Sequence, residues 1–449
     1  MEAQILSRYA DRPLPRYTSY PTAPHFSAGV DGDVYRDWLG AVRADSAASL
    51  YLHIPFCRSM CWYCGCHTTV TARDAPIAQY LAALHREIDL VADALPGRVT
   101  AQHIHFGGGT PTLMKPEQFG LLMGRLRDCF DIAADAEVAI EIDPRTLDPA
   151  MIDALAEGGV TRASLGVQSF DPVVQLAINR VQSFDETKQA IEGLRAAGIA
   201  AVNFDLIYGL PHQTIKSCIE TAVQALELAP DRFAVFGYAH VPQFKLHQRK
   251  IQESALPDCA TRFAQSEAIA AVLVGAGYVR IGLDHFARPE DELTCAFGAG
   301  TLHRNFQGYT TDGCDTLLGF GASSIGRLPA GYVQNAVLIG EYERRIAAGE
   351  LAVAKGRSFE PEDRLRGAII ERIMCDLRVD LDEVCGRFGG DSRQLAACAA
   401  LDPLIRDGIA HRNEGIIALA DEARPLVRVL AAAFDQYLDE SPARHSRAV

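Results

Sequence analysis

Four cysteines stand close together near the start of the chain, at Cys57, Cys61, Cys64 and Cys66. The first three have C-x3-C-x2-C spacing and follow a short apolar run, so we expect a loop of thiols after a strand. Three thiolates on a four-iron cluster leave one iron without a protein ligand, open to a substrate or cofactor. Structural zinc is the alternative, and it would need Cys66 or His53 as its fourth ligand.

Other residues that could do chemistry stand where later strands are expected to end. Three glycines at 107–109 follow the second expected strand, where backbone could approach the charged end of a ligand. Glu141 and Asp205 end the third and fifth strands and could hold hydroxyl groups or an amine, although such acids also cap helices. Gln168 and Arg180 flank the turn after the fourth strand. An arginine there could bind a carboxylate or form only a surface salt bridge.

The elements that position these residues repeat in one order from about residue 49 to 240. A short apolar run, a polar turn and an amphipathic helix alternate, which predicts successive βα units. The expected strands are 49–54, 103–106, 137–142, 162–167, 202–207 and 233–238. We expect an α/β fold, a partial barrel whose site lies at the carboxyl ends of its strands. A doubly wound sheet is the second choice.

The expected barrel at 49–345 has a segment on either side. Residues 1–48 contain spaced prolines and predict an ordered arm or a flexible tail. Residues 346–449 predict a small, mainly helical domain with a hairpin at 409–419.

Charge, hydropathy and the distribution of cysteines argue against several classes of protein. A formal net charge of −14 argues against a protein that coats nucleic acid. The N-terminus has no apolar run of signal-peptide length, and no apolar stretch is long enough to span a membrane, so we expect a cytoplasmic protein. Eight of the twelve cysteines are scattered singly, which favours reduced thiols. Five of these are expected to be small core residues: Cys129, Cys218, Cys375, Cys385 and Cys398.

The cysteine spacing resembles that of the radical S-adenosylmethionine superfamily, and the resemblance narrows to the family of oxygen-independent coproporphyrinogen III oxidases. It runs from about residue 9 to 438. The segments that carry it are 15–23, 57–66, 106–112, 140–145, 166–170, 205–211, 284–289 and 302–311. The resemblance implies a partial (β/α)6 TIM-like barrel and a [4Fe-4S] cluster on Cys57, Cys61 and Cys64.

The resemblance also implies two molecules of S-adenosylmethionine. The first would contact Tyr51, Gly108, Glu141 and Ile325. The second would contact Tyr63, Gly109, Thr110, Gln168, Arg180, Asp205 and Ala239. Tyr63 stands where family members can carry phenylalanine, so an aromatic ring is kept.

The implied reaction converts two propionate side chains of coproporphyrinogen III to vinyl groups, giving protoporphyrinogen IX. The substrate has four carboxylates, and we expect Arg12, Arg16, Arg288 and Arg304 to bind them. Cys66, which has no place among three cluster ligands, would act near the substrate, and Tyr51 and Arg304 complete the expected catalytic set. A low-potential donor such as flavodoxin or ferredoxin would supply the electron, and nothing requires more than a monomer.

Two other readings remain open at this point. Paralogues of this family act as haem chaperones, but they typically lack Cys66, the arm motif at 17–20 and the segment 303–311. A zinc-dependent regulator that binds DNA through the C-terminal hairpin is opposed by the acidic charge and the βα pattern.

Overall fold

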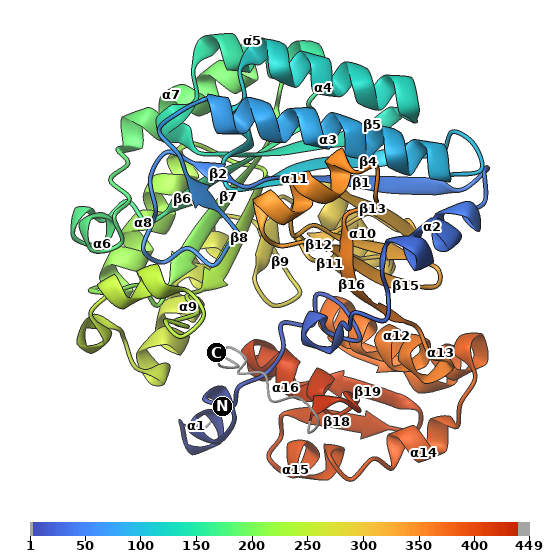
Figure 1. Ribbon diagram of the computed structural model, residues 1–449. Coiled ribbons are helices and arrows are strands. Elements are labelled where there is room, and N and C mark those ends of the chain that lie inside the picture. Colours follow the sequence, from blue (N-terminus) through green and yellow to red (C-terminus); the bar gives the residue numbers. More distant parts are fainter. Residues whose placement is uncertain (1–2, 439–449) are drawn as a thin grey trace.

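The computed structural model describes residues 3–438 and contains a barrel-like sheet with a smaller domain below it (Figure 1). Twelve strands form the sheet in the order β16-β15-β14-β13-β1-β4-β5-β6-β7-β8-β10-β9. No helix in this part of the chain is long and apolar enough to cross a membrane.

Six parallel strands form the centre of the sheet, and all six were predicted. They are β1 (Ala47–Ile54), β4 (Thr100–Gly108), β5 (Asp131–Ile142), β6 (Arg162–Gln168), β7 (Ala201–Tyr208) and β8 (Arg232–Gly237). The helices that connect or follow them are α3 (Ala75–Ala94), α4 (Pro116–Cys129), α5 (Pro149–Gly158), α6 (Pro172–Ala177), α7 (Phe184–Ala196), α8 (Ile215–Glu227) and α9 (Cys259–Gly275). Because consecutive strands are neighbours and both edges stay open, this is the expected partial barrel rather than a doubly wound sheet.

Six further strands widen the sheet at both edges, and the sequence pattern did not predict them. Strand β13 (Thr316–Phe320) is parallel to β1, and three antiparallel strands follow it: β14 (Ile325–Leu328), β15 (Gly331–Asn335) and β16 (Val353–Ser358). On the other edge, β10 (His285–Ala287) and β9 (Val279–Ile281) are antiparallel. Because β16 belongs to the sheet, the boundary predicted at residue 345 falls before the last strand of the barrel domain.

Shorter elements complete the barrel domain. Two small two-stranded sheets pair β2 (Phe56–Cys57) with β3 (Thr69–Val70), and β11 (His303–Asn305) with β12 (Gly308–Thr310). Helix α10 (Glu292–Ala299) contacts strand β9, and helix α11 (Ile339–Ala347) packs against helix α3. Local sequence explains many helix starts: Ser183 and Glu186 form a capping box at α7, and the Asp148 carboxylate accepts from Met151 N at α5.

The C-terminal domain has its own core. Its helices are α12 (Pro361–Asp376), α13 (Leu381–Phe388), α14 (Ser392–Ala396), α15 (Leu401–Arg406) and α16 (Val427–Ala432). Its small sheet contains β17 (Arg378–Asp380), β18 (Ala410–Asn413) and β19 (Ile416–Leu419). The predicted hairpin is formed by β18 and β19, and Glu414 adopts a φ of 52° at its turn.

The N-terminal segment is ordered and belongs to two cores. After helix α1 (Ala3–Ala10), Leu14, Tyr17 and Tyr20 are buried among residues of α12, α13 and α16. Helix α2 (Gly32–Gly40) instead packs on the barrel core through Tyr35 and Leu39. The arm therefore ties the C-terminal domain to the mouth of the barrel (Figure 1).

Candidate active site

The cysteine loop begins where strand β2 ends, at the carboxyl end of the barrel strands. Cys57 is the last residue of β2, and its sulfur accepts a hydrogen bond from Thr68 Oγ1 at 3.2 Å and lies 3.6 Å from Thr110 Oγ1. Burial raises the pKa of the Cys57 thiol, and the two threonine hydroxyls partly oppose this. Both hydroxyls are placed to stabilise a thiolate here.

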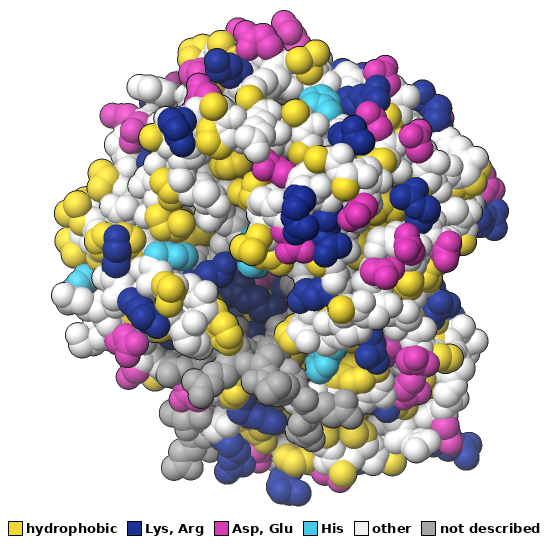
Figure 2. Space-filling view, in the orientation of Figure 1, with side chains coloured by type: hydrophobic (Ala, Val, Ile, Leu, Met, Phe, Trp, Pro, Cys, Tyr) yellow, Lys and Arg dark blue, Asp and Glu magenta, His cyan; other side chains and the backbone are white. Residues whose placement is uncertain are grey.

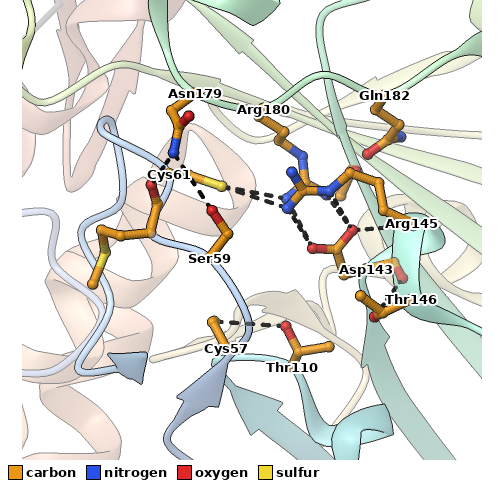
Figure 3. A network of polar contacts seen from close by, with 12 residues as sticks. Cys57, Ser59, Cys61, Thr110, Asp143, Arg145, Thr146, Asn179, Arg180 and Gln182 are labelled. Atoms are coloured by element: carbon orange, nitrogen blue, oxygen red, sulfur yellow. Dashed lines mark hydrogen bonds and ion pairs between the residues drawn. The ribbon is translucent and has the colours of Figure 1, made fainter. Parts of the chain in front are cut away.

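Cys61 is buried beside two arginines. Arg145 Nη2 lies 3.7 Å and Arg180 Nη1 3.6 Å from its sulfur, and both guanidinium groups also pair with the Asp143 carboxylate, at 2.6 and 3.3 Å (Figure 3). Arg180 also donates to the Gly166 carbonyl at 2.6 Å. Its side chain is about 7% exposed, so it is not the surface salt bridge considered from the sequence. Two guanidinium groups that share one carboxylate therefore lie beside a single buried sulfur.

Cys64 and Cys66 contact each other, but they point to different roles. Cys66 N donates to Cys64 Sγ at 3.4 Å. The pKa of Cys64 falls to about 7, chiefly because the Cys66 side chain donates a hydrogen bond to its sulfur, with help from the charges of Lys245 and Arg180. The same interaction raises the pKa of Cys66. Cys64 is therefore the better thiolate ligand, and Cys66 keeps its proton.

The donor set of this loop fits an iron-sulfur cluster better than the zinc alternative with His53. His53 Nδ1 accepts from the Tyr51 hydroxyl at 2.9 Å, and its Nε2 donates to the His67 carbonyl at 3.0 Å, so both ring nitrogens are engaged. Within residues 3–438, no three Cys, His, Asp or Glu side chains are grouped closely enough to hold a single metal ion. Hydrogen bonds and positive charge at Cys57, Cys61 and Cys64 suit thiolates that carry an anionic cluster.

The glycines at the end of β4 let the cysteine loop pack directly against that strand. A Cβ atom on Gly109 would lie 2.5 Å from the Phe56 carbonyl oxygen and 2.7 Å from Thr68 Oγ1. Gly108 has a φ of 120°, and its N–H donates to Glu141 Oε2 at 3.1 Å. Glycine is therefore required here by close approach as well as by conformation.

The residues predicted to contact the first cofactor molecule lie together. The Tyr51 ring stacks on His105 with centroids 5.9 Å apart, and His105 Nε2 lies 3.4 Å from Glu141 Oε1. Tyr51 pairs with Gly319 in the sheet, and the Ile325 carbonyl lies close to Gly319. Burial acts to raise the pKa of Glu141, but hydrogen bonds and charge from His105 outweigh it and lower that pKa.

The residues predicted to contact the second cofactor molecule lie on the next strand ends. Gln168 has a φ of 65°, and its amide and the Arg180 guanidinium both approach Gly166, which pairs with Asp205. The carbonyls of Tyr63 and Ala239 accept from one amide, Gln248 Nε2, at 3.0 and 3.2 Å. Thr110 contacts Cys57, as described above.

Asp205 differs electrostatically from Glu141. Burial and, second, the negative charge of Glu141 raise the pKa of Asp205 to about 7. Its carboxylate accepts from Asn203 Nδ2 at 2.9 Å and from Ser164 Oγ at 3.3 Å, which only partly offsets the rise. A cation bound at this strand end would relieve the repulsion between the two acids.

A cavity of about 1070 Å³ lies against the cysteine loop, between the barrel, the arm and the C-terminal domain. Lys and Arg side chains gather in a hollow at the centre of this face (Figure 2). Five arginines line the cavity: Arg16, Arg262, Arg280, Arg304 and Arg428. Cys66 lines it as well, so the thiol outside the three-ligand set faces the same space.

Two of the four arginines predicted from the sequence line this cavity. Arg304 lies over the Tyr309 ring, 4.4 Å from its centroid, and 4.0 Å from Asp284, while Arg16 reaches the cavity from the arm. Arg12 does not line it, and Arg288 donates to the carbonyls of Ala229 and Pro230 at the amino end of β8. Arg288 therefore lies at the wrong end of the barrel for a substrate contact.

The sequence reasoning missed several residues of the site. Arg262 on α9 and Arg428 on α16 line the cavity, and Arg145 with Asp143 stands beside Cys61. Arg428 interrupts the apolar run 426–430, and a charge in such a run is a signal that could have identified it.

Comparison with known proteins agrees with this geometry. A model of the Radical SAM superfamily matches residues 51–225, and a model of the HemN C-terminal domain matches residues 359–426. Over the whole length of both chains, the sequence is 56% identical to the oxygen-independent coproporphyrinogen III oxidase of Bradyrhizobium diazoefficiens. It is 44% identical to that of Paracoccus denitrificans, over 98% of this chain and 97% of the relative. The solved structure of coproporphyrinogen III oxidase (HemN) from Escherichia coli, described as a radical SAM enzyme, superposes with a TM-score of 0.90 at 37% identity. It covers 95% of this chain and 100% of that chain.

Proposed function

This chain belongs to the family of oxygen-independent coproporphyrinogen III oxidases, and from that premise we propose which of its residues carry each part of the reaction. The protein is a radical SAM enzyme of haem biosynthesis that catalyses oxidative decarboxylation of coproporphyrinogen III without oxygen. The haem-chaperone alternative is not favoured, because the similar proteins named above are oxidases.

Cys57, Cys61 and Cys64 are proposed to hold a [4Fe-4S] cluster. When bound, the cluster and S-adenosylmethionine supply one-electron chemistry that reaches C–H bonds beyond the range of side-chain acids and bases. The protein's part is to stabilise the anionic ligands, through Thr68 at Cys57 and the two arginines at Cys61.

Two S-adenosylmethionine molecules are proposed to occupy neighbouring strand ends. Tyr51, Gly108, Glu141 and Ile325 would hold the first molecule beside the cluster. Tyr63, Gly109, Thr110, Gln168, Arg180, Asp205 and Ala239 would hold the second. The proposal is supported by the two groups of residues that lie at these strand ends. Each group has one acid, and the pKa of Glu141 is lowered while that of Asp205 is raised.

The arginine-lined cavity is proposed to bind coproporphyrinogen III, and this cavity is the observation that carries the assignment. Arg304 and Arg16 would bind propionate carboxylates, which compensates for the net acidic character of the chain. Cys66, exposed to the cavity and favoured in its protonated form, could exchange a proton or hydrogen atom with the substrate. The arm forms one side of this cavity through Arg16 and Thr18, where it would limit the access of water to reactive species.

We further propose a low-potential donor, such as flavodoxin or ferredoxin, as the source of the electron, and a cytoplasmic monomer as the working form. Sedimentation of the holoenzyme checks this part.

Anaerobic turnover tests the proposed function. The protein with reconstituted iron and sulfide, given dithionite, S-adenosylmethionine and coproporphyrinogen III, is expected to form protoporphyrinogen IX and carbon dioxide. Equilibrium dialysis should find two S-adenosylmethionine molecules per chain. A single metal ion per chain in place of a four-iron cluster would overturn the assignment. Tight binding of porphyrinogen without turnover would overturn it as well.

A further inference from the structure

Two short segments flank the cysteine loop and hold it in place. On one side, Trp62 N donates to the Ile178 carbonyl at 2.9 Å, and Asn179 Nδ2 donates to the Met60 carbonyl at 2.8 Å. These contacts come from α6 and the turn that follows it, which lies at the left edge of the molecule in Figure 1.

On the other side, residues 244–250 donate to three carbonyls of the loop. Lys245 Nζ donates to Cys66 O at 2.9 Å, His247 Nε2 to Cys64 O at 2.7 Å, and Gln248 Nε2 to Tyr63 O at 3.0 Å. Lys250 Nζ lies 5.5 Å from the Trp62 ring centroid. The carbonyl groups beside the third cluster cysteine are therefore held by this segment.

The two flanking segments form one structural unit with the loop. Val174 and Ile178 from the α6 side and Ile251 from the other side are buried in a single hydrophobic cluster. Trp62 and Tyr63 pack against that cluster. Residues exposed on these two segments consequently surround the outer side of the loop.

That outer side is unusually apolar. Five of the thirteen exposed large hydrophobic residues in 3–438 lie on these two segments: Val173, Leu176, Val181, Phe244 and Leu246. Each is 58–67% exposed. Figure 2 shows hydrophobic side chains gathered at the left edge, where α6 lies in Figure 1. Exposed apolar groups that cluster in this way mark interaction surfaces.

One of the two segments, residues 244–250, is also basic, although the chain as a whole carries −14. Residues 241–252 contain Lys245, Arg249 and Lys250 and no acidic residue. A surface with an apolar centre and basic neighbours fits an acidic protein partner. A second copy of this chain would place the same basic residues opposite one another, which repels.

We propose that this surface, called the loop face, docks a small acidic protein that carries single electrons at low potential. The loop face consists of Val173, Leu176, Val181, Phe244 and Leu246 with Lys245, Arg249 and Lys250. The proposal rests on the proposed function, because it needs a cluster on the loop. One electron leaves the carrier and enters the cluster, so the carrier is oxidised and the cluster reduced by one electron, with no bond broken and no proton moved.

Two physical arguments support this occupant. Electron tunnelling weakens steeply with distance, so a carrier must approach the residues that surround the cluster ligands. Complexes of electron carriers are small and transient, and opposite charges steer their encounter. The loop face provides both a small apolar centre and positive charge. Both lie on the two segments that contact the cysteine loop directly.

The test uses holoenzyme of the double variant Leu176→Asp/Arg249→Glu. Photoreduced flavodoxin is mixed with the oxidised holoenzyme, and bleaching of the visible absorption of the cluster is followed before S-adenosylmethionine or porphyrinogen is added. The second-order rate is expected to fall by about tenfold or more at low salt, while reduction by dithionite keeps its rate.

A matched control makes equivalent changes elsewhere, an exposed leucine to aspartate and an exposed basic residue to glutamate. Leu121 on α4 is 68% exposed, close to the 67% of Leu176, and Lys216 on α8 is exposed and basic. Leu121→Asp/Lys216→Glu should be reduced by flavodoxin at the wild-type rate. A comparable loss in this control would mean that overall charge, not the loop face, governs the encounter, and would overturn the proposal.

Other outcomes also decide the question. Equal flavodoxin rates for wild type and the loop-face variant overturn the proposal. Slowed reduction by dithionite overturns it too, because the segments would then only shape the loop. A wild-type dimer that the double variant dissociates assigns the loop face to a second copy. Normal docking without conversion of coproporphyrinogen III would support the loop face and contradict the proposed function instead.

Discussion

Replacing Asp205 with asparagine is expected to stabilise the cofactor-free protein at neutral and higher pH. The pKa of Asp205 rises from its ordinary 3.8 to about 7 because of burial and, second, the charge of Glu141. Folding therefore favours the protonated carboxyl. Wild-type stability is highest below about pH 4 for this group and is lost as pH rises through about 7.

The size of the effect follows from the two pKa values. At about 1.36 kcal/mol per pH unit, this carboxyl disfavours folding by roughly 1.5 kcal/mol at pH 5, where the folded state must take up a proton, and by roughly 4 kcal/mol at pH 8, where it is ionised in both states. Asparagine fits the site: its oxygen can still accept from Asn203 Nδ2, and its amide can donate to Ser164 Oγ. The variant should thus exceed wild type by up to these amounts.

Denaturant unfolding at pH 5 and pH 8 measures the difference. Asp143→Asn provides a control of opposite sign, because Arg145 and Arg180 hold the pKa of Asp143 below its usual range despite its burial. That variant should lose stability at pH 8, on the order of 3 kcal/mol, since it leaves buried guanidinium charge unpaired. If Asp205→Asn matches wild type at both pH values, the repulsion between the strand-end acids is absent and the reasoning fails.

Three further substitutions probe the loop and the cavity. Gly109→Ala should push the loop away from Phe56 and Thr68 and destabilise the protein by about 1–3 kcal/mol, with iron content per chain as the second readout. Unchanged iron and stability would show that the close approach is unimportant. Cys66→Ser should keep the cluster and bind S-adenosylmethionine but lower turnover on the order of 100-fold; full activity would remove Cys66 from the catalytic set. Arg304→Leu should raise KM for coproporphyrinogen III roughly 10- to 100-fold with the cluster intact, as measured by steady-state kinetics, and unaltered kinetics would place the substrate elsewhere.

The central barrel was predictable because each of its strands has its own local pattern. The segments around Leu50, Ile104 and Ile140 contain apolar residues that alternate with polar ones or follow one another directly. Each segment is as long as a strand, and turn residues follow it. The added strands were not predictable in this way. Strands such as β9 (Val279–Ile281) have three residues, and they form because the sheet edge is already present to pair with them.

The residues of the site were likewise predictable only where they belong to one contiguous motif. The cysteine spacing and the glycines of β4 are contiguous motifs, so their chemistry is visible in the sequence. The cavity is assembled from distant segments: Arg16 comes from the arm, Arg262 from α9 and Arg428 from α16. No local pattern shows that these helices meet. Arg288 was wrong for the same reason, because its motif does not reveal at which end of the barrel it lies.

The shared core of the arm and the C-terminal domain imposes an order on biosynthesis. Tyr9, Leu14 and Tyr17 leave the ribosome first, yet the helices that bury them, α12 and α16, are made last. Strand β16 ends at Ser358 and α16 ends at Ala432, so at roughly 5–20 residues per second the barrel is complete for roughly 4–15 seconds before the C-terminal domain can pack against it. Until then the cavity beside the cysteine loop lacks its C-terminal lining residues, Pro425 and Arg428. In a stalled or truncated chain, the cavity would remain open on the side that the C-terminal domain normally lines.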